Sequence, residues 1–138
     1  MKGQGVITEQ WVPVDPGFAR AHPLGRHLGG VWLVVIWVGL HAFGVIWALV
    51  GHVLVQSSWA VGLHLLFGIL LVLLLVIDGF ALLALLARHP LARVLVWVVL
   101  ILSFPLSIPL IFYWADGVKP NLIYAHRFER MVVQKGGK

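Results

Sequence analysis

The sequence predicts an all-α membrane protein with three transmembrane helices, an extended N-terminal arm and a short amphipathic C-terminal helix. Three long apolar runs carry this prediction, and they extend from Val31 to Val55, from Trp59 to Ala87 and from Val94 to Ala115. A helix needs roughly 20 apolar residues to cross the hydrocarbon core of a bilayer, and each run is long enough. Composition agrees, because 61% of the residues are hydrophobic and only 11% are charged, whereas about 25% are charged in soluble domains.

The charge and cysteine content exclude several classes of protein. The net charge of +5 arises from the segments outside the apolar runs, which favours contact with membrane headgroups over a clustered nucleic-acid interface. No nucleic-acid partner is therefore expected. The chain has no cysteine, so disulfides, thiolate metal sites and iron–sulfur clusters are excluded, and no metal site is predicted.

Three regions divide the chain. Residues 1–30 contain Pro13, Pro16 and Pro23, which prevent a long helix and predict an extended surface arm. Residues 31–115 form the three-helix transmembrane domain, and residues 116–138 form an interfacial tail. The first apolar run is too long for the core of a signal peptide, so we expect it to be retained as a span.

The turns between the apolar runs predict how the helices cross the membrane. Gln56, Ser57 and Ser58 form a short uncharged turn, so the first two helices should be antiparallel. We expect the protein to lie in the inner membrane of a bacterium. The second turn carries Arg88 and Arg93, and the positive-inside rule places this turn in the cytoplasm, on the same side as the N-terminus. A third span then places the C-terminal tail outside, although that tail also carries several Lys and Arg residues.

The tail residues 121–134 show helical periodicity. At 100° per residue, one arc contains Tyr124, Ala125, Phe128, Met131 and Val132, and the opposite arc is polar. This pattern predicts an amphipathic helix lying in the membrane interface. The alternative is a tail that packs on a neighbouring subunit.

A polar layer is predicted midway along the spans. Ionisable groups inside a membrane are costly and mark candidate functional sites. His41 lies ten residues after the start of the first run, Asp78 lies ten residues before Arg88, and Ser103 lies ten residues after Arg93. The three residues therefore share one depth, where a proton relay or a quinone headgroup site is predicted. The alternative is a His–Asp pair that only ties two helices together.

The third run contains prolines next to this layer. Pro105 and Pro109 should kink the helix and leave the carbonyls of Ile101 and Pro105 free, because proline lacks an N–H and clashes with the carbonyl four residues back.

A second pair of histidines flanks the first turn. His52 and His64 should lie at comparable depth in a helical hairpin, and His41 shares a helix face with His52. Neutral imidazole is a good axial ligand for haem iron or for the magnesium of a chlorophyll-type pigment. These three histidines are therefore candidate cofactor ligands. The alternative is hydrogen bonding of each imidazole to headgroups, water or backbone.

His64, Gly68 and Asp78 follow one another along the second predicted helix. With three spans and a chain of this length, this pattern resembles the small cytochrome b anchor subunits of succinate dehydrogenase, over part of one helix. That family usually carries an Asp-Tyr pair closer to the histidine, whereas Asp78 lies further along and is followed by Gly79. The resemblance therefore assigns no family.

These observations favour a small accessory or anchor subunit of a larger, energy-transducing inner-membrane complex, respiratory or photosynthetic, in contact with other membrane subunits and lipids. No phosphate-binding loop, nucleophile–base motif or row of carboxylates is present, so no catalytic residue is assigned and a non-catalytic subunit is expected. One alternative is a cofactor-binding subunit that holds haem b, bacteriochlorophyll or quinone through His41, His52 and His64. A further alternative is a small oligomeric transporter with Asp78 facing a pathway.

Overall fold

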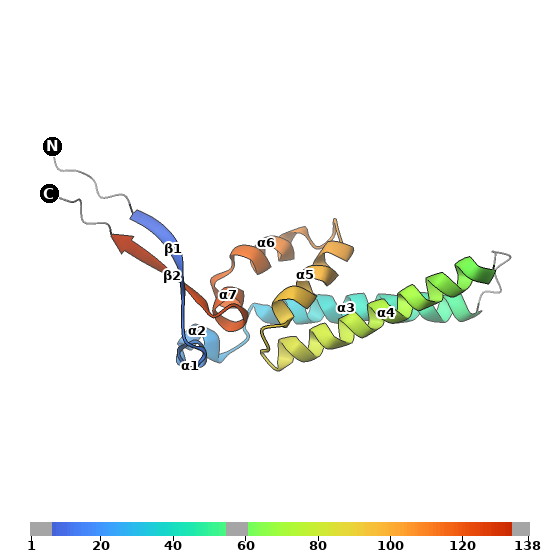
Figure 1. Cartoon of the computed structure of the whole chain (residues 1–138), viewed down its shortest axis with the longest axis horizontal. Coiled ribbons are helices and arrows are strands. Elements are labelled where there is room, and N and C mark those ends of the chain that lie inside the picture. Colours follow the sequence, from blue (N-terminus) through green and yellow to red (C-terminus); the bar gives the residue numbers. More distant parts are fainter. Residues whose placement is uncertain (1–6, 55–60, 134–138) are drawn as a thin grey trace.

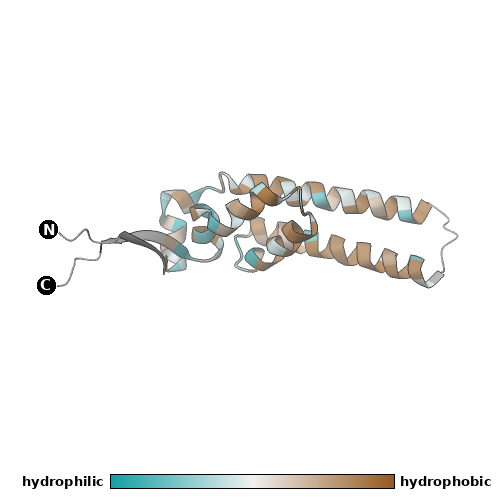
Figure 2. Cartoon of the chain, turned by 90° about the horizontal axis from the view of Figure 1, so that it is seen from above, coloured by the Kyte–Doolittle hydropathy of each residue, from teal (hydrophilic) through white to brown (hydrophobic). Residues whose placement is uncertain are grey.

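Two long antiparallel helices form the body of the molecule, and a small cap of short helices and two strands covers one end (Figure 1). The computed structural model describes residues 7–54 and 61–133. Figure 2 shows hydrophobic residues along the two long helices and hydrophilic residues gathered in the cap. Most of the chain that the structure describes is helical, as the sequence predicts.

Helices α3 (Val31–Leu54) and α4 (Val61–Leu86) are long and apolar enough to cross a membrane. Only 22% of each apolar window is buried inside the molecule. The buried stripe on α3 consists of Val31, Val34 and Val38, whose spacing places them on one helix face. It belongs to the same core cluster as the small side chains of α4, Ala81 and Ala84. The rest of both helices exposes large hydrophobic side chains.

The third apolar run does not form a continuous span. It forms two shorter helices, α5 (Ala92–Leu102) and α6 (Ile108–Asp116). An 11-residue helix is about 16 Å long, roughly half of a hydrocarbon core of about 30 Å. In Figure 1, α6 runs back beside α5 towards the cap. The predicted third span is therefore replaced by a helical hairpin that turns between residues 103 and 107.

The hairpin turn has a local cause in the sequence. Pro105 and Pro109 remove two helical N–H donors, and the buried Ser107 hydroxyl donates to the carbonyl of Leu100 at the end of α5. The carbonyls that we expected to be free are used within the turn, which corrects that prediction. Ile101 O accepts from the N–H of Phe104 at 3.2 Å, and Pro105 O accepts from that of Ile108 at 3.3 Å.

The N-terminal arm is extended only in its first part. Strand β1 (Ile7–Pro13) is followed by the short helices α1 (Pro16–Ala21) and α2 (Pro23–Arg26). Asp15 caps α1 by accepting the N–H of Gly17 at 2.7 Å. Proline at the first position of each helix is compatible with helix initiation, so the prolines that exclude a long helix begin two short ones.

The predicted amphipathic tail helix is wrong beyond residue 124. Helix α7 (Val118–Tyr124) ends there, His126 adopts a positive φ of 50°, and strand β2 (Arg127–Val133) follows. Strand β2 pairs antiparallel with β1, in a register that joins Ile7 to Val133 and Pro13 to Arg127. A partner strand supplies the main-chain hydrogen bonds that a helix would satisfy locally, and tertiary pairing of this kind overrides helical periodicity.

A hydrogen bond fastens the cap to a long helix, because the Tyr124 hydroxyl of α7 donates to Leu85 O of α4 at 2.9 Å. Within the α5–α6 hairpin, the Trp114 indole of α6 donates to Arg93 O of α5 at 3.3 Å. Because β1 and β2 pair, the N-terminal and C-terminal segments lie at the same end of the molecule as the turn that carries Arg88 (Figure 1). This corrects the expectation that the tail lies on the opposite side from the N-terminal arm.

Candidate functional site

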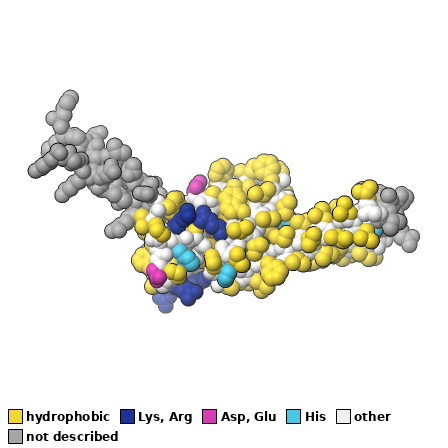
Figure 3. Space-filling view, viewed as in Figure 1, with side chains coloured by type: hydrophobic (Ala, Val, Ile, Leu, Met, Phe, Trp, Pro, Cys, Tyr) yellow, Lys and Arg dark blue, Asp and Glu magenta, His cyan; other side chains and the backbone are white. Residues whose placement is uncertain are grey.

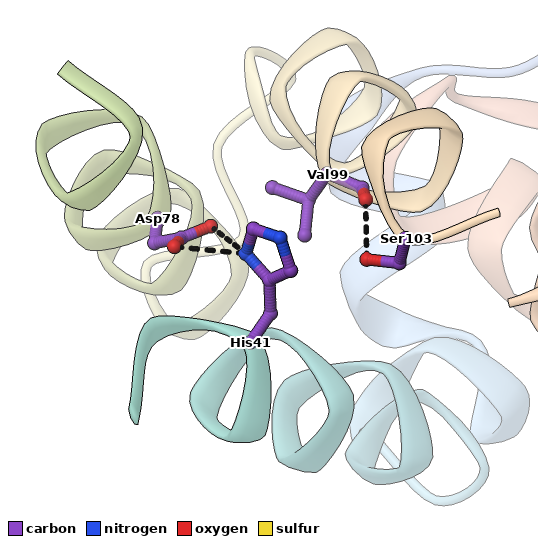
Figure 4. Close-up of polar contacts among 4 residues, drawn as sticks. All are labelled: His41, Asp78, Val99 and Ser103. Carbon is purple, nitrogen blue, oxygen red and sulfur yellow. Dashed lines mark hydrogen bonds and ion pairs between the residues drawn. The ribbon is translucent and has the colours of Figure 1, made fainter. Parts of the chain in front are cut away.

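A polar contact between the two long helices joins His41 of α3 to Asp78 of α4. His41 Nδ1 lies 3.0 Å from Oδ1 and 2.9 Å from Oδ2 of Asp78 (Figure 4). Asp78 is 1% exposed and the His41 side chain is 19% exposed. The shared depth that the sequence predicts for these two residues therefore corresponds to direct contact.

This contact sets the chemistry of the imidazole. A carboxylate accepts from Nδ1, so in the neutral ring the proton sits on Nδ1 and the lone pair sits on Nε2. Figure 4 shows Nε2 directed away from Asp78, towards Val99 and Ser103 of the α5 end. Within the described ranges, Nε2 has no hydrogen-bond partner. The pair can therefore present a hydrogen-bond acceptor at Nε2.

A cavity of about 240 Å³ lies beside this imidazole, lined by Trp37, Leu40, His41, Ser103 and Leu106. Ser103, the third residue of the predicted layer, therefore shares a cavity with His41. Its hydroxyl donates to Val99 O at 2.7 Å, which leaves its lone pairs able to accept. The three residues of the predicted layer come from three elements: His41 from α3, Asp78 from α4 and Ser103 from the end of α5.

Trp37 is a polar residue of this cavity that the sequence reasoning missed. Its Nε1 is buried and has no partner in the part of the chain that the structure describes. A buried N–H without a partner costs about 1–3 kcal/mol, and here the nitrogen is covered by protein atoms while the side chain lines the cavity. The signal was available, because Trp37 lies four residues before His41 and residues at that spacing are neighbours on a helix.

The arrangement offers a hydrogen-bond acceptor next to a mostly apolar cavity. His41 supplies the acceptor, and Trp37, Leu40 and Leu106 supply apolar walls. Among residues 7–54 and 61–133 there is no group of three or more histidine, cysteine, aspartate or glutamate side chains placed to hold a metal ion. A ligand with polar ring substituents and an apolar tail matches these walls.

The outer histidines lie elsewhere. The His52 and His64 rings stack with centroids 3.8 Å apart and an interplanar angle of 22°. They line a separate apolar groove of about 520 Å³ between α3 and α4, to which His41 does not contribute. Of the three predicted cofactor ligands, His41 therefore lines one cavity, and His52 and His64 line another.

The stacked pair lacks the arrangement of two axial ligands on opposite faces of a macrocycle, because no plane fits between rings in face-to-face contact. His52 Nε2 lies over Gly68, where an added Cβ would be 3.1 Å from that nitrogen. Gly68 thus makes room for the imidazole of His52. Ligation of one metal by both histidines would require the rings to separate.

The comparisons with known proteins assign no relative. No protein-family model, curated protein or solved structure matches the chain. The function therefore rests on the geometry of the residues themselves.

Proposed function

We propose that the chain is an integral membrane protein in which α3 and α4 span the bilayer and the α5–α6 hairpin enters from the cap side and returns to it. The exposed surfaces of α3 and α4 are apolar, as lipid and partner helices require. All ten Lys and Arg residues lie outside residues 31–87, and the segment that joins α3 to α4 has no charge. The positive-inside rule then places the cap in the cytoplasm.

Depth supports this placement of the hairpin. His41 lies ten residues into α3, which is about 15 Å along the helix and so near the centre of a bilayer core of about 30 Å. The turn after α5 lies at the same level, since Ser103 and His41 line one cavity. Broken helices at the middle of a membrane occur where backbone is buried in protein or lines a binding cavity.

We propose further that this cavity binds the headgroup of a quinone. The observation that carries the proposal is the His41–Asp78 pair, because the Nε2 of His41 is left without a partner among the described residues and His41 lines a cavity together with Trp37 and Ser103. Nε2 accepts from a quinol hydroxyl, and the Trp37 side chain forms part of the wall beside the quinone ring. Asp78 holds the imidazole in the required tautomer, and the apolar walls suit the tail.

Electron transfer would need a redox partner, and no metal cluster site is found among the described residues. The proposal is therefore a small accessory or anchor subunit of a larger, energy-transducing inner-membrane complex, with catalysis completed by another subunit. The large apolar side chains exposed on α3 and α4 provide surfaces for such subunits as well as for lipid.

Calorimetric titration of the purified protein in mild detergent with a decyl-substituted benzoquinone tests the quinone proposal. The wild-type protein should bind, and His41→Leu should weaken binding at least about tenfold, because each 1.4 kcal/mol of lost interaction is tenfold in affinity. His52→Leu is the matched control, since His52 lines the other groove, and its affinity should be unchanged. Absence of binding to the wild type, or equal loss in both variants, would reject the site.

A further inference from the structure

A second polar cavity lies in the cap, remote from the His41 site. It has a volume of about 250 Å³ and is enclosed by α1, α2, the end of α4 and the segment that follows α7. The polar side chains of its lining are Arg20, Arg88, His89 and His126, and no aspartate or glutamate belongs to the lining. Figure 3 shows Lys, Arg and His side chains gathered at this end of the molecule.

Arg88 is held in place by the backbone of α2. Its two terminal nitrogens donate to Gly25 O at 3.0 Å and to Arg26 O at 2.9 Å. A guanidinium has further N–H donors beyond these two, so the fixed side chain still has donors available. A planar guanidinium that is already ordered loses little entropy when it binds an oxyanion.

The other basic side chains are also free to donate. The side chains of Arg20 and His126 make no hydrogen bond or ion pair with any residue whose side chain the structure describes. His89 Nδ1 accepts from the N–H of Leu91 at 3.3 Å, so in the neutral ring its Nε2 carries the proton. The cavity thus collects hydrogen-bond donors and positive charge without a compensating carboxylate.

Two residues that line this cavity have an uncommon backbone conformation. Among the described residues, the non-glycine residues with positive φ are Arg88 at 54° and His126 at 50°, and both line it. This conformation is uncommon for residues with a Cβ, and such residues cluster at ligand sites because the surrounding structure must hold them there.

We propose that this cavity binds the phosphate group of an anionic phospholipid in the cytoplasmic leaflet. Phosphate oxygens match the geometry of arginine donors. Ala87, Arg88 and Pro90 of the lining follow directly on α4, so the cavity lies at the depth of lipid headgroups when α4 spans the bilayer. The inference depends on this placement of α4 and is independent of the quinone site.

Phosphate also occurs free in solution, so the test separates the two sources. The detergent-solubilised full chain is titrated by calorimetry with short-chain phosphatidylglycerol, with short-chain phosphatidylcholine and with inorganic phosphate. Phosphatidylglycerol should bind at least about tenfold more tightly than the other two. Equal binding of inorganic phosphate would overturn the lipid assignment. Phosphatidylcholine has the same phosphate with a compensating trimethylammonium group, so its equal binding would overturn the assignment to an anionic lipid.

Substitutions locate the binding in this cavity. Arg20→Gln should weaken phosphatidylglycerol binding about tenfold, which corresponds to the loss of one charge-assisted hydrogen bond. Arg20 is exposed and has no described partner, so the variant should fold. Arg26→Gln is the matched control, because it removes the same charge from the same end of the molecule but not from the cavity lining, and its affinity should stay within about twofold of wild type. Equal effects of the two substitutions would overturn the site.

Discussion

Both carboxylate oxygens of Asp78 face the same nitrogen of His41, at 3.0 and 2.9 Å, across the interface between α3 and α4. The surrounding side chains of this interface are mostly valine, leucine and alanine, which pack in more than one rotational setting. A single buried polar pair selects one setting, as buried polar residues do in coiled coils. The pair therefore has a structural role in addition to any role in ligand binding.

Removing one partner of this pair should destabilise the protein more than removing both. His41→Leu leaves a buried carboxylate without its donor, and breaking a buried pair in this way costs about 3–5 kcal/mol. Replacement of both His41 and Asp78 by leucine should recover most of that loss, because no buried charge remains. Denaturant unfolding of the two single variants and the double variant in mixed micelles measures the coupling. Additive effects of the two single substitutions would show that the pair does not act as a unit.

Gly25 should not tolerate a side chain. A Cβ at this position would overlap with Ala19 O, so α1 and α2 would have to separate and the contact of Arg88 with Gly25 O would be strained. Gly25→Ala should therefore lower the free energy of unfolding by about 1–3 kcal/mol, the usual cost of overpacking.

Gly39→Ala and Gly44→Ala are the controls for Gly25→Ala. An added Cβ meets nothing within 4 Å at either position of α3, and alanine is favoured over glycine in helices by about 1 kcal/mol. Both should be neutral or stabilising in thermal unfolding followed by circular dichroism. Equal tolerance at Gly25 would disprove the close contact between α1 and α2.

Stability at high pH should depend on Tyr124. Burial raises the pKa of its hydroxyl from 10.0 to about 12, although Arg88 lowers it in part. The folded state therefore holds this proton more tightly than the unfolded state. The contribution of the protonated Tyr124 hydroxyl to the free energy of unfolding is therefore fully present below pH 10. It amounts to about 3 kcal/mol and is lost as the pH rises from 10 through 12.

Tyr124→Phe should flatten that part of the pH dependence. It should also cost about 1 kcal/mol at neutral pH, because the hydrogen bond to Leu85 O is lost. Thermal unfolding of both proteins from pH 8 to 12 gives the difference that belongs to Tyr124. Parallel curves over this range would contradict the assignment.

The sequence predicts the depth of the His41–Asp78 site along the helices, but it does not predict that the two side chains face each other. Counting from Val31 and from Arg88 gives His41 and Asp78 similar depths, and the contact confirms the count. Which faces of the two apolar helices meet is not readable from hydropathy, because large hydrophobic side chains occupy the exposed faces of both helices as well as the buried ones. The spacing of Trp37 and His41 indicates that the two side chains are neighbours on one helix face, whereas the burial of the Trp37 N–H depends on the packing around it.

The hairpin and the tail depend on interactions between distant residues. Hydropathy is equally high for a span and for two half-helices, so the run from Val94 to Ala115 is ambiguous, and Pro105 and Pro109 indicate a break without its direction. Residues 127–133 become a strand through pairing with residues 7–13 at the other end of the chain. Periodicity within the tail contains no information about such a partner.

Cysteine labelling most directly tests whether the third apolar segment returns to the side from which it starts. The natural chain has no cysteine, so single substitutions give clean signals with an impermeant maleimide applied to right-side-out and inside-out vesicles. Leu91→Cys before α5 and Asp116→Cys at the end of α6 are both exposed positions, and both should react from the same side, whereas Ser57→Cys should react from the other. Reaction of Asp116→Cys only from the side of Ser57→Cys would show that the segment crosses the membrane and would contradict the hairpin.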